Sequence, residues 1–204
     1  MSDLQCPVRV LVARHGEADY ETDRLNDHGG TLSPIGRQQS RALAATLATE
    51  RVARVWSSPM SRAVQTAEIV AAALGCDVTV REGLREFGAG VHAGHRFDPD
   101  PLRPTFLRWL AGDLTERVEG AESGAEVIGR FAVVLEGIAD LHRGETVLVV
   151  SHGGAICTGV PALAHNLTAG FPKERPLPNT GVVELAGDAD GWRAVAWLGE
   201  PVRP

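Results

Sequence analysis

The chain of 204 residues has 44% hydrophobic residues and a formal net charge of −6 at pH 7. This length suits one α/β domain over residues 1–204, and the hydrophobic fraction argues against a disordered chain. The acidic balance argues against a nucleic-acid-binding surface, and no apolar run reaches the length of a membrane span.

The cysteines and the N-terminus indicate the compartment. Cys6, Cys76 and Cys157 are odd in number and widely scattered, which fits free thiols in a reducing cytoplasm and no thiol-ligated metal site. The first seven residues lack the basic stretch and apolar run of a secretory signal. We therefore expect a cytoplasmic protein.

The first predicted element is a buried strand over residues 8–13. Its apolar and β-branched run stops abruptly at Arg14-His15-Gly16-Glu17. Open α/β sheets carry their chemistry just past the carboxyl ends of such strands, and Gly16 allows a sharp turn there. A histidine beside an arginine at this position suits a nucleophile or base next to an anion clamp.

A polar loop and two helices follow. Residues 18–31 carry turn signals and predict a loop. Ser33-Pro34 predicts a helix start, because serine can cap a helix and proline suits its first position. A short strand over residues 54–57 leads to a second helix, whose expected start signal is Ser58-Pro59 and whose expected end is Gly75.

Arg62 lies in the first turn of that second helix, which the chain enters directly from a strand. Backbone N–H groups and the positive end of the helix dipole favour an anion at such a junction. A guanidinium would add a fork of donors. Most arginines on helices are simply exposed, but this position, which matches that of His15, favours an anion-binding role.

The central part of the chain predicts a long insertion. After a short strand over residues 77–80, residues 83–104 are rich in Gly, Pro, His and Arg, and an ordered loop of this length is usually functional. A short helix around Phe106 and a longer one with apolar positions from Val127 to Leu141 are expected next. We expect residues 83–119 to cover a substrate pocket.

The histidine motif returns late in the chain. Residues 146–150 predict a second buried strand, which ends in Ser151-His152-Gly153-Gly154. Two histidines, each followed by glycine at a strand end, indicate a site far more strongly than one. The remaining expectations are a helix over residues 155–163, a proline-broken loop over 168–178, and a hairpin of strands at 182–185 and 193–197.

These motifs together resemble the histidine phosphatase superfamily, which includes cofactor-dependent phosphoglycerate mutases and many small-molecule phosphatases. The resemblance covers about Val8 to Leu185. It rests on three segments that occur in the family's order, namely Arg14–Glu17, Ser57–Ala67 and Ser151–Gly154. The helix start at Ser33–Gln39 also resembles the family pattern. It implies a phosphoglycerate mutase-like fold, which is a three-layer α/β/α sandwich with a mostly parallel central sheet.

The resemblance also implies the roles of four residues. His15 would attack phosphorus in line and form a phosphohistidine, which divides one displacement into two easier ones. Arg14, Arg62 and His152 would meet the charge on the phosphoryl oxygens in a water-poor pocket. A neighbouring phosphate dianion would favour an N–H on His152.

Two further residues take their roles from the family pattern. Glu86 precedes a glycine-rich segment and matches the family's proton donor, which would later activate water. Glu82 is a rival with a poorer match to the flanking glycines. Thr180 precedes a strand where the family often has a polar residue near the phosphate, so we expect a contact through its N–H or hydroxyl.

One departure from the family pattern separates hydrolysis from isomerisation. Family mutases usually continue the opening motif with a small hydroxylic residue, a tryptophan and an asparagine, whereas this chain has Ala18-Asp19-Tyr20-Glu21. We therefore predict a metal-independent phosphatase that needs no cofactor and acts on a small phosphorylated metabolite. A cofactor-dependent phosphoglycerate-type mutase and a non-catalytic phosphate-binding protein of the same fold are the alternatives.

Other groups have no assigned role. His92 and His95, with His28, lack a recognised metal-ligand spacing, so we expect a structural or substrate-lining role and no metal. Cys157 lies in the first turn of a helix, where a thiol can be activated, but packing is its expected role. Because family members are often dimers, a homodimer is possible.

Overall fold

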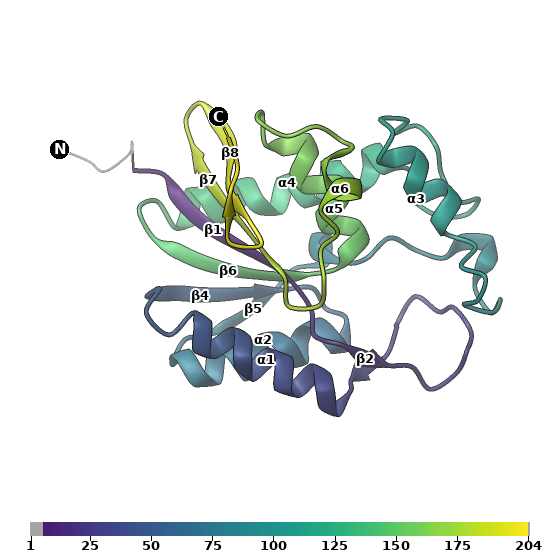
Figure 1. The fold of residues 1–204 in the computed structure, drawn as a ribbon, viewed down its shortest axis with the longest axis horizontal. Coiled ribbons are helices and arrows are strands. Elements are labelled where there is room, and N and C mark those ends of the chain that lie inside the picture. Colours follow the sequence, from purple (N-terminus) through teal and green to yellow (C-terminus); the bar gives the residue numbers. More distant parts are fainter. Residues whose placement is uncertain (1–5, 204) are drawn as a thin grey trace.

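The computed structural model describes residues 6–203 and places a seven-stranded sheet between two layers of helices (Figure 1). The strands of this sheet are β1 (Val8–Arg14), β4 (Val52–Ser57), β5 (Val78–Val80), β6 (Thr146–Ser151), β7 (Val182–Asp188), β8 (Gly191–Trp197) and β9 (Glu200–Pro201). Their order is β5-β4-β6-β1-β7-β8-β9. The first four strands in this order are parallel, and β7 to β9 extend the sheet antiparallel.

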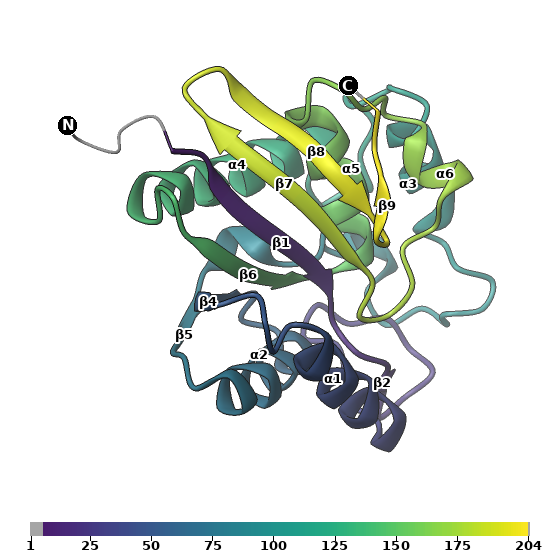
Figure 2. The ribbon, with the colours of Figure 1, turned by 60° about the vertical axis from the view of Figure 1, so that its left-hand side comes forward.

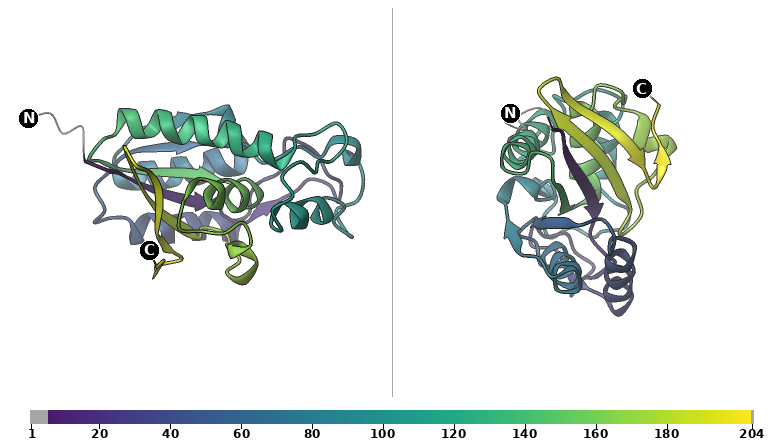
Figure 3. Two further views of the ribbon diagram at one scale, coloured as in Figure 1. Left: turned by 90° about the horizontal axis from the view of Figure 1, so that it is seen from above. Right: turned by 90° about the vertical axis from the view of Figure 1, so that its left-hand side faces the viewer.

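Two pairs of helices form the outer layers. α1 (Pro34–Thr46) and α2 (Ser61–Leu74) cover one face of the sheet, and α4 (Gly124–Leu141) and α5 (Gly153–Leu163) cover the other (Figures 1 and 3). The expected three-layer sandwich with a mostly parallel sheet is confirmed. Among the described residues, no helix has the length and apolar character needed to cross a bilayer.

The apolar run of β1 follows from burial on both faces of the sheet. Val10 and Val12 belong to the core beneath α4 and α5, whereas Leu11 and Ala13 belong to the core beneath α1 and α2. Successive side chains of a strand point to opposite faces, so a central strand between two helical layers must be apolar throughout. Figure 2 shows β1 between β6 and the β7–β8 hairpin.

Three of the helix boundaries follow their capping signals. The Ser33 side chain accepts the N–H of Gly36 at the start of α1, and Ser123 forms a capping box with Glu126 at the start of α4. α2 ends at Gly75, which has a left-handed backbone. These local hydrogen bonds involve few residues close in sequence, which is why the sequence predicts them.

The structure corrects the sequence-based expectations at four places. α2 begins at Ser61 rather than at Ser58-Pro59, because the Ser58 hydroxyl contacts His152 instead of capping the helix. Leu141 is 67% exposed, because it lies in the last turn of α4 and outside the core. Both expected loops contain short elements, namely β2 (Ala18–Asp19) and β3 (Thr31–Leu32) in the first loop and α6 (Phe171–Glu174) in the second.

Removal of the Phe131 ring is expected to destabilise the fold strongly. Phe131 is 0% exposed on α4, and a Cβ added at Gly159 of α5 would lie 2.7 Å from its ring. Phe131→Ala should lower the free energy of unfolding by about 3–5 kcal/mol through lost burial and a cavity, as measured by urea denaturation. Val133→Ala, at a position that is 69% exposed, is the matched control and should change it by less than about 0.5 kcal/mol. A loss below about 1 kcal/mol at Phe131 would contradict the packing described.

The register of the parallel strands brings three strand ends together. Arg14 pairs with Ser151, and Ser57 pairs with Val150. The next N–H groups continue these ladders, since His15 donates to the Ser151 carbonyl and Ser58 donates to the Val150 carbonyl, both at 3.0 Å. His15, Ser58 and His152 therefore follow three adjacent strands at one edge of the sheet.

Two long connections extend beyond this edge. One carries β2 and β3, and the other runs from residue 83 through α3 (Arg103–Trp109) (Figure 1). Seen from above, α3 and its neighbouring loops lie at one end of the molecule (Figure 3). Side chains from both connections can therefore enclose the space beyond the strand ends.

Candidate active site

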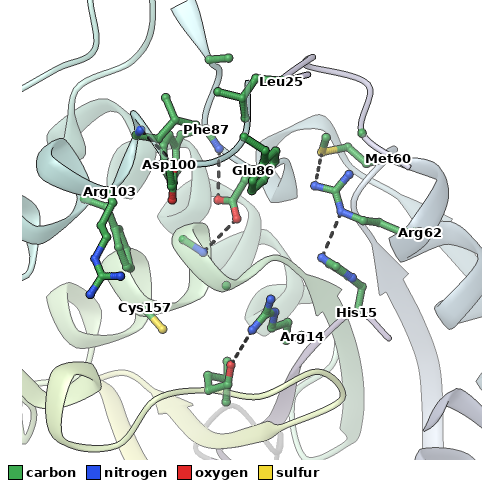
Figure 4. A pocket seen from close by; sticks show the side chains of 18 of the residues that line it. Arg14, His15, Leu25, Met60, Arg62, Glu86, Phe87, Asp100, Arg103 and Cys157 are labelled. Carbon is green, nitrogen blue, oxygen red and sulfur yellow. Dashed lines mark hydrogen bonds between the residues drawn. The ribbon is translucent and has the colours of Figure 1, made fainter. Parts of the chain in front are cut away.

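A pocket with a volume of about 420 Å³ lies at the carboxyl ends of the parallel strands (Figure 4). Arg14, His15, Arg62 and Glu86 line it, together with side chains of the two long connections. His152 is fully buried, and its ring centroid lies 5.0 Å from that of His15. The structure thus brings five of the six predicted site residues to one place.

The hydrogen bonds of His15 determine its tautomer. Its Nδ1 lies 2.6 Å from the Gly16 carbonyl oxygen. A carbonyl can only accept, so Nδ1 carries the proton and Nε2 carries a lone pair. The Arg62 Nε–H donates to this lone pair at 3.0 Å (Figure 4). The tautomer leaves the lone pair on Nε2, and Nε2 can act as a nucleophile only if another acceptor takes over the Arg62 donor.

Burial keeps His15 neutral. Desolvation, with the charge of Arg62 as the next contribution, lowers the pKa of His15 from 6.5 to about 3. Burial and the Arg62 charge also lower the pKa of His152 well below its usual value. An imidazole must be unprotonated to attack phosphorus, so His15 is in its reactive form at neutral pH.

These two neutral histidines should make the fold sensitive to mild acid. Below a pH of about 6.5 the two histidines become protonated in the unfolded chain but stay neutral in the folded chain, because the folded pKa of His15 is about 3. As the pH is lowered, the free energy of unfolding should therefore decrease by up to about 1.4 kcal/mol per pH unit for each histidine. Urea denaturation between pH 7 and pH 5.5 tests this, and a pH-independent free energy of unfolding would contradict it. His15→Ala should lose about half of the dependence, since one of the two buried groups is removed.

Ser58 orients the second histidine. Its Oγ lies 2.7 Å from Nε2 of His152 and accepts the N–H of Met60 at 3.2 Å. The arrangement that uses every group has the Ser58 hydroxyl donating to Nε2, so that the imidazole proton resides on Nδ1. His152 then carries an N–H at Nδ1 while its ring is neutral.

Loss of this hydroxyl should weaken catalysis. Ser58→Ala removes about 1–2 kcal/mol of orienting interaction, so kcat/KM for a phosphate ester should fall roughly five- to thirtyfold. Ser57→Ala is the matched control, because Ser57 is equally buried but its hydroxyl donates to the Ser58 carbonyl and not to His152. Equal kcat/KM values for the two variants, from steady-state assays, would rule out the orienting role.

Three residues around His15, namely Arg14, Arg62 and His152, each have a buried donor atom without a hydrogen-bond partner among the described residues. These atoms are Arg14 Nε, Arg62 Nη1 and His152 Nδ1. Arg14 is held in place by its Nη1, which donates to the Leu177 carbonyl at 2.9 Å. A buried donor without a partner costs about 1–3 kcal/mol. An anion with several acceptor oxygens, such as a phosphoryl group, has enough acceptors for all three donors.

Glu86 connects the long insertion to α5. Its carboxylate accepts the N–H of Gly154 at 2.9 Å and that of Ala155 at 2.8 Å. The free N–H groups of a helix N-terminus are natural partners of a carboxylate. A Cβ at Gly154 would lie 2.6 Å from the Glu86 Oε1 and 2.3 Å from the Phe87 ring, so only glycine admits this approach. The carboxylate is thereby held against the inner end of the pocket.

Gly16 has a different purpose from the one predicted. Its backbone angle is not of the left-handed kind that requires glycine. A Cβ at Gly16 would instead lie 2.6 Å from the Gly36 carbonyl oxygen at the start of α1. The Gly16 N–H is held by the Thr66 hydroxyl at 3.1 Å. Close backbone approach, rather than a special turn, explains the glycine after His15.

The structure places Thr180 elsewhere than predicted. Its N–H donates to the Arg14 carbonyl at 3.0 Å, and its hydroxyl donates to the Asn179 carbonyl at 2.8 Å. Both groups are therefore occupied by the backbone, and Thr180 is not among the residues that line the pocket. Its physical role is to position the segment that carries His15, as does Asn179, whose Nδ2 donates to the His15 carbonyl at 3.0 Å.

The remaining candidates lie outside the reactive group. Glu82 is an exposed partner of Arg85, and a ring nitrogen of His92 lies 3.5 Å from a ring nitrogen of His95 in an exposed loop. Within residues 6–203, no three His, Cys, Asp or Glu side chains are grouped to hold a metal. Cys157 is buried in the pocket wall, and burial, with the Glu86 charge second, raises its thiol pKa to about 12.

Sequence reasoning missed Ser58, Thr66 and Asn179, which position the reactive groups. Ser58 carried a usable signal, because it follows a strand directly, as His15 and His152 do. Thr66 lies one helical turn after Arg62 and accepts from Gly16 across the interface, so its role depends on packing. Asn179 gave no signal of its own in the sequence.

Comparison with known proteins identifies relatives across nearly the whole chain. A sequence model of the histidine phosphatase superfamily, branch 1, matches residues 10–199. Phosphoglycerate mutase-like protein 4 of Arabidopsis thaliana is 32% identical over 92% of this chain and 84% of its own length. A probable phosphoglycerate mutase GpmB of Escherichia coli is 30% identical over 95% of this chain and 91% of its own length.

Solved structures show the same architecture. A mycobacterial glucosyl-3-phosphoglycerate phosphatase, solved in complex with VO3, superimposes with a TM-score of 0.78 at 27% identity, over 93% of this chain and 98% of its own. Bacillus stearothermophilus YhfR superimposes with a TM-score of 0.79 at 25% identity, over 95% and 97% of the two chains. Sequence, fold and the paired strand-end histidines agree, and the chain belongs to the histidine phosphatase superfamily.

Proposed function

We propose that this protein is a phosphatase that hydrolyses small phosphomonoesters through a phosphohistidine at Nε2 of His15. The observation that carries the proposal is a nucleophilic lone pair on His15 beside three buried donors without partners, on Arg14, Arg62 and His152. The similar solved structures include a protein named as a phosphatase, which supports hydrolysis as the reaction.

The proposed reaction has two displacements at phosphorus. His15 Nε2 forms a bond to phosphorus while the ester oxygen leaves, and a protonated Glu86 supplies the proton that this oxygen takes. Arg14, Arg62 and the N–H of His152 hold the phosphoryl oxygens. Ionised Glu86 then removes a proton from water, which attacks phosphorus, breaks the P–N bond and releases inorganic phosphate.

Protein side chains supply every group in this scheme, so we propose no metal and no organic cofactor. Residues 83–119 contribute Glu86, Phe87, Phe97 and Phe106 to the pocket, which supports the proposal that this insertion covers the substrate. The cytoplasmic location and the homodimer stay predictions.

A phosphoglycerate-type mutase is the second candidate, because the relatives in Arabidopsis thaliana and Escherichia coli carry mutase names. Incubation with 3-phosphoglycerate and a trace of the 2,3-bisphosphate separates the two reactions. Isomerisation without phosphate release would favour the mutase, whereas release of inorganic phosphate without isomerisation supports hydrolysis.

A quenched-reaction experiment tests the phosphohistidine directly. The protein is mixed with a generic ester such as 4-nitrophenyl phosphate and denatured within milliseconds in alkali, because phosphohistidine is unstable in acid. We expect peptide mass spectrometry to find the phosphoryl group on His15. Phosphate release without any labelled histidine, in wild type and His15→Ala alike, would overturn the proposed mechanism.

A further inference from the structure

We infer that the site acts on the phosphate esters of apolar alcohols, those with an aromatic ring or a branched carbon chain, in preference to sugar phosphates or phosphorylated hydroxy acids. The inference rests on the proposed function and concerns the part of the pocket that would hold the leaving alcohol.

The pocket has two parts of different chemistry. Arg14, His15, Arg62 and Glu86 form its inner end. Beyond them the wall is aliphatic and aromatic, and its principal members are Leu25, Phe97, Leu102, Phe106, Leu110 and Leu177. A phosphomonoester with its phosphoryl group at His15 therefore directs its alcohol into an apolar space.

Much of this wall is packed against the rest of the fold. Leu25, Leu110 and Leu177 are buried in the fold. The Phe106 ring is stacked on Phe87 at 6.3 Å, and Phe87 meets Trp109 edge-on at 4.8 Å between ring centroids. A preformed apolar wall favours an apolar group, because neither partner must be reorganised to make the contact.

The outer part of the pocket has few polar groups to recognise a sugar or a carboxylate. Among the described residues that line it, Tyr20 carries the single hydroxyl and Arg103 the single cation, and Arg103 lies apart from Arg14 and Arg62 (Figure 4). Asn26 also lines the pocket, and its Oδ1 already accepts the backbone N–H groups of His28 and Gly29. Asp27 and Asp100 each use one carboxylate oxygen to accept a backbone N–H group, from Ala89 and Leu102. Few donors and acceptors remain for an alcohol with several hydroxyls, so most of these hydroxyls would lose their water partners on burial here, which is unfavourable.

The mouth of the pocket exposes two aromatic rings. Tyr20 follows β2, Phe97 belongs to the insertion, and their ring centroids lie 5.7 Å apart. Both rings line the pocket, and they are 42% and 44% exposed. Covering exposed apolar surface with another apolar group is favourable, because it removes that surface from water. A ring or branched chain on the alcohol would provide this cover.

Esters with similar leaving groups provide the test. kcat/KM is compared for phenethyl phosphate, glycerol 3-phosphate and 3-phosphoglycerate, since all are alkyl esters and differ mainly in the polarity of the alcohol. We expect phenethyl phosphate to be favoured roughly ten- to a hundredfold. Equal or higher kcat/KM for either polar ester would overturn the inference, and preference for 3-phosphoglycerate would assign Arg103 to its carboxylate.

Two matched variants locate the preference. Phe97→Ala should reduce the ratio of phenethyl to glycerol phosphate turnover roughly three- to tenfold. Leu107→Ala removes a side chain of similar exposure, 41% against 44% for Phe97, that does not line the pocket. Its ratio should equal that of wild type. A ratio unchanged by Phe97→Ala would remove the mouth of the pocket from the inference.

A binding measurement separates this inference from the proposed function. Phenylphosphonate should bind roughly tenfold or more tightly than methylphosphonate in calorimetric titrations, whether or not any ester is hydrolysed. If His15-dependent hydrolysis occurs without apolar preference, the substrate class is wrong and the mechanism stands. If phenylphosphonate binds more tightly but no ester is hydrolysed, the proposed mechanism is wrong and the apolar pocket stands.

Discussion

Replacement of His15 by alanine is expected to lower kcat/KM for phosphate esters by roughly a thousandfold or more, because the covalent route requires a nucleophile. The remaining donors on Arg14, Arg62 and His152 would still bind phosphate, so the loss should appear mainly in kcat. Steady-state release of inorganic phosphate measures both quantities.

The control for this variant is a histidine outside the pocket. His95 is exposed, and its ring contacts only His92 among the described residues, so His95→Ala should retain wild-type kcat and KM. Retained activity in a folded His15→Ala chain would mean that phosphorus is attacked by water directly, or at another residue.

Replacement of Arg62 is expected to have the second largest effect. Arg62 is buried, donates its Nε–H to His15 and has a buried Nη1 without a hydrogen-bond partner among the described residues. Arg62→Ala should reduce kcat/KM roughly a hundred- to a thousandfold, as the loss of a fixed donor to a transition-state charge does. Arg62→Lys should recover little, because an ammonium group cannot reproduce the planar fork of a guanidinium.

A second measurement on this variant distinguishes charge from packing. The Arg62 charge contributes to the lowering of the His15 pKa to about 3. A neutral side chain at position 62 should therefore raise the pKa of His15, and the acid limb of the kcat/KM profile should move to higher pH. Arg41→Ala, at an exposed position of α1, should leave both the rate and the profile unchanged. A fall in rate without any change of the His15 titration would contradict the electrostatic role.

The geometry also suggests how the ground state is protected. Arg62 occupies the lone pair of His15 by a hydrogen bond of 3.0 Å, and Glu86 is held by the N-terminus of α5. The phosphoryl group of a substrate offers acceptor oxygens that can take over the arginine. In the proposed reaction, phosphate binding would therefore also free the lone pair of His15.

Local signals explain how much of the fold could be predicted. The runs over residues 8–13 and 146–150 are predominantly apolar because β1 and β6 lie between two helical layers. Such a run predicts a buried strand from the sequence alone. Ser33 and Ser123 cap helices through bonds to residues three positions away. Ser58, in contrast, uses its hydroxyl on His152, at a distance of 94 positions, and the predicted helix start moved to Ser61.

The sequence by itself determined which side chains stand at the strand ends, because parallel strands with buried runs place their carboxyl ends at one edge. It thereby predicted Arg14, His15, Arg62 and His152 as one group, and the order of motifs indicated the family. Only the tertiary structure decided the rest. The hydrogen bond from Arg62 to the His15 lone pair, the bond from the Thr180 N–H to Arg14 and the apolar wall of the pocket all depend on contacts between residues far apart in the chain. No local pattern encodes such contacts, because they form only when separate segments pack together.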